Sequence, residues 1–208
     1  MEKVYSYLDG FDKIYCYPNS NVLKNNLNIE DKKFLEQVER RLVSLKLNEL
    51  LDKPIKGNFD FNHLKKIHKY LFEDLYAWAG IPRKCDLAKR NMFCKPQFIE
   101  EYAESIFSKL KEENYYFDYD YDKKIISLVN LFADINALHA FREGNGRTQR
   151  EFIEQLSKAN NIDLDLTCVK REDMIEACST SMDGNYELLT KIFFDNAKPL
   201  EKNEKYCK

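Results

Sequence analysis

The chain has 208 residues, 44% of them hydrophobic, and its formal net charge at pH 7 is −2. This length and composition allow one sizeable hydrophobic core and give no reason to expect two domains. The near balance of charge argues against a nucleic-acid-binding protein or a membrane-surface protein, because the chain as a whole would not attract a polyanion.

The sequence also bears on the compartment and on metals. No apolar run approaches the ~20 residues of a membrane span, and the first residues do not open a signal peptide, so we expect a cytoplasmic protein. The six cysteines include no C-x-x-C pair, which favours reduced thiols over a disulfide framework or a zinc site. His63 and His68 are five residues apart on a predicted helix and face different directions, so a histidine-based metal centre is not expected.

Residues 1–27 predict an irregular arm, since they are rich in Tyr, Asn and Asp and show little periodicity. A first helix is expected to follow. We take Asn28 as its cap, with Asp31 three residues later, and an apolar stripe continues to about Leu51.

A second helix is predicted from the cap Asp60, because apolar residues recur at steps of three and four as far as Trp78. Gly80 and Pro82 are expected to end it. Nearly all of this helix is interpreted as core. His68 lies on it, and we interpret this histidine as structural and not as a pocket residue.

The segment 83–95 shows no helical period and lies between two helix signals, so a short hairpin or extended loop fits it best. A further helix is expected to begin at Pro96 and continue to about Leu110. The aromatic tract 115–121 is read as a linker that packs onto the domain, although it could also dock a partner.

Three more helices are predicted in the second half of the chain, over residues 125–135, 173–182 and 186–194. The first of these leads to His139 at its end. The last two are joined at Asp183-Gly184-Asn185. Residues 197–208 are expected to be a frayed, charged tail.

The segment 139–150, HAFREGNGRTQR, predicts a site for phosphate groups. Gly144, Asn145 and Gly146 allow a tight turn whose consecutive N–H groups point at one place, and the apolar residues that follow indicate a helix beginning there. Arg147 and Arg150 are three residues apart on its first turn, so both guanidinium groups can point at the same phosphates.

Two residues of the same segment can carry out chemistry. Glu143 lies at the mouth of the nest, and one carboxylate together with phosphate oxygens is the usual way in which a protein holds Mg²⁺. His139 is the side-chain type that can accept a proton near neutral pH. A Gly-Asn-Gly alone would indicate only a turn, but a turn requires neither the acid, nor the base, nor the two arginines.

This segment resembles the signature of Fic-domain proteins, H-x-F-x-[D/E]-G-N-G-R-x-x-R, at every specified position, with Ala140 where proline is usual. The resemblance extends over most of the chain and implies a single all-α Fic domain, a helical bundle over residues 1–208 with a β-hairpin flap at 83–95. It implies that Lys89 and Arg90 in the flap approach the nucleotide. It also points to Met182 as part of the adenine pocket.

The function that the resemblance implies is transfer of AMP from ATP to a Ser, Thr or Tyr hydroxyl of another protein. In it His139 is the base, Glu143 holds Mg²⁺, the amides of residues 144–146 bind phosphate, and Arg147 and Arg150 hold the leaving phosphates. Transfer of UMP, GMP, phosphate or phosphocholine by the same fold is an alternative, and so is an inactive nucleotide-binding interaction module.

The resemblance also implies partners. Small bacterial Fic toxins suggest a hydroxyl-bearing loop of a type II topoisomerase subunit as the target. Many Fic proteins carry an inhibitory helix, [S/T]-x-x-x-E-[G/N], but here Ser108 and Glu112 are followed by Glu113 and no complete match exists. We therefore expect a separate small antitoxin, whose glutamate would pair with Arg150.

Overall fold

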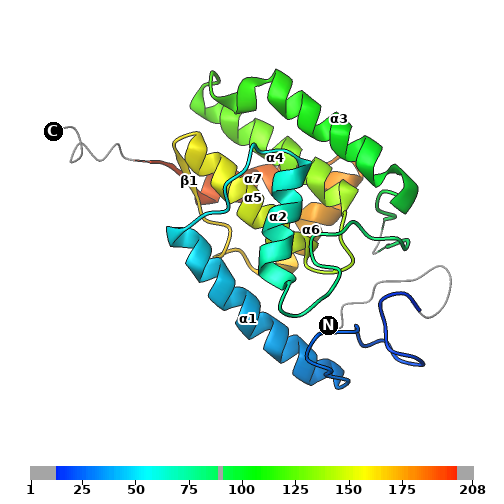
Figure 1. Ribbon diagram of the computed structural model, residues 1–208. Helices are drawn as coiled ribbons and strands as arrows, with labels where there is room; N and C mark the ends of the chain where they lie inside the picture. Colours follow the sequence, from blue (N-terminus) through cyan, green and yellow to red (C-terminus); the bar gives the residue numbers. More distant parts are fainter. Residues whose placement is uncertain (1–12, 89–90, 201–208) are drawn as a thin grey trace.

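The computed structural model describes residues 13–88 and 91–200, and over these ranges the protein is built from seven α-helices, two short 3₁₀ turns and one two-stranded sheet (Figure 1). The expected all-α class is therefore confirmed. In chain order the elements are α1 (Lys32–Asp52), α2 (Phe61–Phe72), η1 (Pro96–Phe98), α3 (Ile99–Glu112), η2 (Asn114–Tyr116), α4 (Tyr121–Leu138), α5 (Asn145–Ala159), β1 (Ile162–Leu164), α6 (Arg171–Met182), α7 (Glu187–Asn196) and β2 (Ala197–Pro199).

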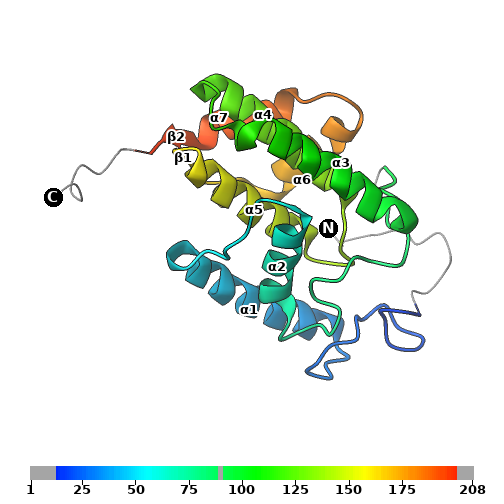
Figure 2. The same cartoon turned by 45° about the horizontal axis from the view of Figure 1, so that its top comes forward.

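The helices pack around a single cluster of buried apolar side chains. α5 lies against both α2 and α4, and α4 also contacts α3 and α7. Figure 2 shows α1 at one edge of the molecule and α3 at the opposite edge, with α2 and α5 between them. Within the described ranges, no helix is long and apolar enough to span a membrane.

The beginning of α1 differs from the sequence prediction. Asn28 does not cap the helix: its φ of 54° places it in a left-handed turn, and its N–H donates to the carbonyl of Asn25. The cap is Asp31, whose carboxylate accepts a hydrogen bond of 2.7 Å from the N–H of Phe34. The chain therefore turns at Asn28, and the helix begins after the turn has ended, at Lys32 with Asp31 as its cap.

Asp60 caps α2 as predicted and accepts a 2.7 Å hydrogen bond from the N–H of His63. The helix ends at Phe72, however, and not near Trp78. The N–H groups of Leu75 and Tyr76 both donate to the Phe72 carbonyl, so the chain leaves the helix in successive turns. The apolar pattern continues past the helix because these turns also pack into the core.

In the segment 83–95, the described residues on either side of 89–90 lie against each other. The predicted hairpin is present as an isolated antiparallel bridge between Ala88 and Met92, and the N–H of Phe93 donates to the carbonyl of Leu87. Tyr15, in the N-terminal arm, accepts a hydrogen bond from the N–H of Lys84 through its hydroxyl. The arm therefore contacts the base of this flap.

The C-terminal end of the described chain is ordered differently from the prediction. Ala197–Pro199 form β2, which pairs in antiparallel fashion with β1, so residues 197–199 are not a frayed tail. Residues 201–208 lie outside the described part. Short strands of three residues carry little periodicity, which is why this pair left no signal in the sequence.

In the tract 115–121, Tyr116 is buried, as expected for a linker that packs onto the domain.

Candidate active site

The two glycines of the 139–150 segment have different surroundings. Gly144 precedes α5 with a φ of 82°, and a Cβ added there would lie 2.3 Å from the ring of Phe72. Both its backbone conformation and its lack of space therefore require glycine. A Cβ on Gly146 would meet only Nη1 of Arg150, at 3.7 Å. The fold itself requires Gly144, whereas Gly146 keeps an approach to the helix N-terminus open.

Asn145 holds the loop in shape with its side chain. Its Oδ1 accepts a 2.8 Å hydrogen bond from the N–H of Phe141, and its Nδ2 donates to the carbonyl of the same residue at 2.6 Å. Thr148 adds a 3.0 Å hydrogen bond from its hydroxyl to the carbonyl of Gly144. The amide side chain of Asn145 is therefore committed to the loop, and its backbone N–H is the group that can serve a ligand.

His68 supports this loop from α2, which agrees with its interpretation as a structural residue. Its Nδ1 accepts a 2.7 Å hydrogen bond from the N–H of Gly80, so its Nε2 carries the hydrogen and donates to the carbonyl of Glu143 at 2.9 Å. Burial lowers the pKa of His68 to about 3, and the ring stacks on Phe141 with centroids 3.8 Å apart. A neutral imidazole thus links α2 to the middle of the loop and to Gly80.

His139 ends α4 in a left-handed conformation, with φ 43° and ψ 53°. Its Nδ1 is 3.2 Å from the carbonyl oxygen of Asn136, and its ring stacks on Phe93 of the flap with centroids 3.7 Å apart. A carbonyl can only accept, so this contact places the hydrogen on Nδ1 and leaves Nε2 as the basic nitrogen. The geometry suits a general base.

Arg83 is a positioning residue that the sequence analysis missed. Its side chain is 2% exposed, and its guanidinium group donates to the carbonyls of His139 at 2.8 Å, Cys85 at 2.7 Å and Cys94. Its N–H also donates to the carbonyl of Ala140. Burial lowers the pKa of Arg83. One planar donor group therefore ties both ends of the flap to the residue that carries the base, and no sequence motif marks it.

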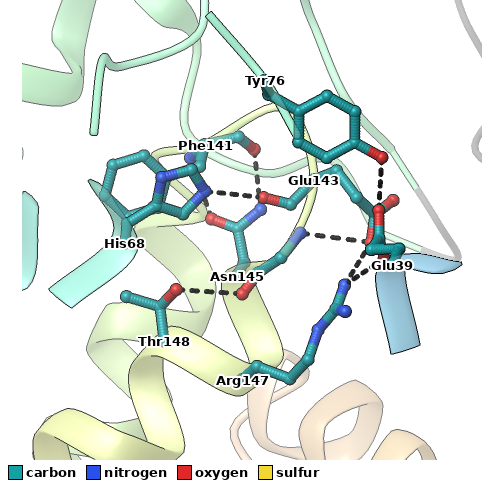
Figure 3. A network of polar contacts seen from close by, with 9 residues as sticks. Glu39, His68, Tyr76, Phe141, Glu143, Asn145, Arg147 and Thr148 are labelled. Carbon is teal, nitrogen blue, oxygen red and sulfur yellow. Dashed lines mark hydrogen bonds and ion pairs between the residues drawn. The ribbon is translucent and has the colours of Figure 1, made fainter. Parts of the chain in front are cut away.

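Arg147 points toward α1 in a polar network, shown in Figure 3. Its Nη2 is 2.7 Å from Oε1 of Glu39 and 3.4 Å from Oε1 of Glu143. The other oxygen of Glu39 accepts a hydrogen bond from the hydroxyl of Tyr76. Burial alone would lower the pKa of Arg147, but the two carboxylates raise it. Neither Glu39 nor Tyr76 belonged to the predicted site.

Arg150 lies one helical turn further and is half-buried. Burial lowers its pKa, and Glu154 offsets part of that effect. In the described part of the chain, no ion pair involves this guanidinium group. The structure thus brings His139, Glu143, the nest and both arginines to the junction of α4 and α5, but it gives the two arginines different neighbours.

The chain as a whole is similar to known proteins. Residues 58–157 match the model of the Fic/DOC family. The chain is 38% identical over 189 residues to the protein adenylyltransferase VbhT of Bartonella schoenbuchensis, covering 90% of this chain and 40% of VbhT. It is 33% identical to the "Probable protein adenylyltransferase y4lH" of Sinorhizobium fredii, over 82% of this chain and 88% of that protein. The chain belongs to the Fic/DOC family.

Solved structures agree with this membership. The N-terminal Fic domain of a VirB-translocated Bep effector from Bartonella quintana, solved with bound ADP, superposes with a TM-score of 0.84 at 25% identity. The alignment covers 90% of this chain and 95% of that domain. The Fic fold expected from the sequence is therefore confirmed.

Two predicted parts of the nucleotide site of this Fic domain lie on the flap and on α6. Met182 is the last residue of α6 and is half-buried. The next residue, Asp183, accepts a 2.9 Å hydrogen bond from Nδ2 of Asn91 in the flap, so the flap and the end of α6 meet. Lys89 and Arg90 lie outside the described residues, and their predicted contact with a nucleotide stays a prediction.

The side chains of the site fit a Mg²⁺ ion that is held mainly by the phosphate groups of a bound nucleotide. Among the residues that the structure describes, no group of three or more His, Cys, Asp or Glu could form a metal cage. Glu143 is a single buried carboxylate directly before the nest, and its Oε1 accepts a 3.1 Å hydrogen bond from the N–H of Gly144. Mg²⁺ commonly takes one carboxylate and completes its shell with phosphate oxygens and water.

Proposed function

We infer that this Fic protein is a protein adenylyltransferase, which moves AMP from ATP to a hydroxyl side chain of a target protein. The observation that carries this inference is the position of a basic imidazole nitrogen, Nε2 of His139, at the same helix junction as an anion nest. Two relatives are named protein adenylyltransferase and probable protein adenylyltransferase, which supports the same chemistry here.

The geometry supports a role for each of these residues. Nε2 of His139 accepts the proton of the target hydroxyl, whose oxygen then bonds to the α-phosphorus of ATP while the bond to the β-phosphate oxygen breaks and diphosphate leaves. The N–H groups at the start of α5 and the guanidinium group of Arg150 stabilise the negative charge on the phosphates. Bound Mg²⁺, held by Glu143, would neutralise further charge there.

Gly146 favours nucleotidyl transfer over the alternatives. The resemblance to Fic proteins implies a lysine at this position for the phosphate-transferring Doc branch, whereas this chain has glycine, and a Cβ there would meet only the end of Arg150. A close approach of the triphosphate to the helix N-terminus is compatible with that space. The nucleobase of the donor nucleotide is also part of the proposal, and the name of the relative supports adenine.

The test uses ATP labelled at either phosphate. Purified protein is incubated with a bacterial lysate and with α-labelled or γ-labelled ATP, and His139→Ala serves as the control. We expect label on protein from the α position only, and none with the control. Label from γ only would show phosphorylation, and label from neither would show a nucleotide-binding module.

We also propose that the protein is the toxin of a toxin–antitoxin pair. Two observations support this: the inhibitory pattern is incomplete at Ser108, whose hydroxyl donates to Glu104, and Arg150 has no carboxylate paired with it among the described residues. A separate antitoxin would supply that carboxylate. Expression of the chain alone should then arrest growth, with a type II topoisomerase subunit as the labelled target. A lysate without a labelled band at that size would remove this target.

A further inference from the structure

Glu39 is the only acidic side chain that α1 buries, and it is 6% exposed. Glu39 lies 108 residues before Arg147 and 37 residues before Tyr76 in the sequence, yet its side chain contacts both. Each of its oxygens has its own donor, the Arg147 guanidinium group on Oε1 and the Tyr76 hydroxyl on Oε2. The carboxylate is therefore held in one orientation.

The network that Glu39 enters continues to Glu143. One nitrogen of Arg147, Nη2, is shared unequally between the two carboxylates, with the shorter distance of 2.7 Å to Glu39 and the longer one of 3.4 Å to Glu143. The guanidinium carbon also lies 4.8 Å from the centroid of the Phe72 ring, which fixes the arginine from the other side. Figure 3 shows Arg147 reaching from α5 toward Glu39 and Glu143.

Stability alone does not account for this arrangement. Burying an ion pair costs desolvation free energy that its attraction often fails to recover. Apolar residues of similar size would hold α1 to α5 and to the turns after α2 at least as well. Without Glu39, Arg147 would have Glu143 as its only carboxylate partner in the network and would pair with it fully. A carboxylate that is fully paired with a guanidinium group is a poorer ligand for a cation, because the two positive groups compete for it.

We propose that Glu39 is a positioning residue for nucleotide binding: it draws Arg147 away from Glu143, so that Arg147 competes less strongly with Mg²⁺ for Glu143, and Tyr76 fixes Glu39 for this role. The proposal rests on the proposed function, since it takes Mg²⁺-ATP as the ligand. It makes α1, which carries no part of the signature, a determinant of how much Mg²⁺ the site requires.

The test measures binding of the analogue AMPPNP by titration calorimetry at a series of Mg²⁺ concentrations, so that no transfer is needed. Glu39→Gln keeps the size of the side chain and removes its charge, and we expect it to raise the half-saturating Mg²⁺ concentration about 10-fold. Glu36→Gln makes the same change on the exposed face of α1 and should leave that concentration unchanged.

A second comparison separates positioning from simple destabilisation. In an Arg147→Gln background, Glu39→Gln should have no further effect on the Mg²⁺ requirement, because Glu39 acts through Arg147. Glu39→Asp should restore part of the wild-type behaviour. Tyr76→Phe leaves both charges in place and should raise the Mg²⁺ requirement by less, about 3-fold. This variant replaces Glu39→Gln in the test if Glu39→Gln does not fold.

The outcomes are distinct. A lower melting temperature for Glu39→Gln with an unchanged Mg²⁺ requirement would show that Glu39 only stabilises the fold, and the proposal would be wrong. A lower Mg²⁺ requirement would show that Glu39 restrains the site, which also contradicts it. If the wild-type protein bound no AMPPNP with or without Mg²⁺, the proposed function would fail first. If the wild-type protein bound AMPPNP but transferred no AMP, the proposed function would fail, while the effect of Glu39→Gln on the Mg²⁺ requirement would still test the role of Glu39.

Discussion

Arg147 and Arg150 lie three residues apart in the first two turns of α5, but their surroundings differ. Arg147 faces α1 and α2 and is engaged by two carboxylates and an aromatic ring, whereas Arg150 lies beside Gly146 and forms no ion pair within the described chain. One signature motif can therefore divide its charges: Arg147 is packed into the fold, and Arg150 is the arginine that we propose for the ligand.

The glycines follow the same division. Gly144 is closed in by Phe72 on the side of α2, and Gly146 is open on the side of Arg150. The N-terminus of α5 therefore has a packed side, with Gly144 and Arg147, and a ligand side, with Gly146 and Arg150. Substitutions on the packed side should reduce stability first, and those on the ligand side should reduce binding or catalysis first.

The largest effect is expected for His139→Ala. Loss of a general base should lower the rate of transfer by ~10²–10⁴, while ATP binding stays close to that of the wild type because the imidazole acts on the target hydroxyl. Parallel measurements of transfer rate and ATP affinity check this. If His139→Ala kept more than about a tenth of the wild-type rate, His139 would not be the general base.

The glycine pair tests the two sides directly. Gly144→Ala should lower the free energy of unfolding by about 3 kcal/mol, because the new methyl group meets Phe72 in a backbone conformation that disfavours it. Gly146→Ala should leave the free energy of unfolding unchanged or slightly higher and weaken ATP binding. Urea denaturation and calorimetry measure both. Equal losses of stability in the two variants would contradict the division.

The arginine pair should separate binding from stability. Arg150→Ala is expected to weaken ATP binding about 10-fold with little change in melting temperature, and to affect AMP less, since it removes a charged contact to the outer phosphates. Arg147→Ala should lower the melting temperature because it leaves Glu39 and Glu143 buried without their shared cation. If Arg150→Ala weakened ATP and AMP equally, its assignment to the outer phosphates would be wrong.

The smallest effect concerns pH on the ligand side. Burial, with Glu151 nearby, raises the pKa of Glu154 to about 7. Because the folded-state pKa exceeds the unfolded one, this group contributes stability that is fully present below about pH 4.5 and is lost as the pH rises through about 7. We expect the wild type to lose on the order of 1 kcal/mol more than Glu154→Gln between pH 5 and pH 8. Denaturation curves at both pH values would show it, and parallel losses would refute it.

Much of the fold could be predicted from local patterns. Each helix was predicted, and the caps Asp60 and the end of α4 at His139 were placed correctly, because periodicity and capping are properties of neighbouring residues. Helix ends were less predictable. The cap of α1 is Asp31 instead of Asn28. α2 stops at Phe72 and not near Trp78, because apolar residues pack into a core from turns as well as from helices.

The candidate site divides in the same way. The residues between His139 and Arg150 could be found because they are contiguous, and their order is specific. Arg83 and Glu39 could not, because their role arises from contacts across 56 and 108 residues of chain. Nothing in the neighbourhood of either residue marks it, and a lone charge in a sequence is most often a solvated one.

The left-handed backbone of His139 has a consequence for the stability that the protein can reach. Glycine and asparagine adopt this conformation at helix ends most easily, whereas other residues bear a cost of ~1–2 kcal/mol. The fold therefore gives up stability by placing histidine at a position where asparagine would adopt the left-handed conformation at a lower cost. His139→Asn should be more stable than the wild type and inactive, and a catalogue of stabilising substitutions would then lead away from function at this position.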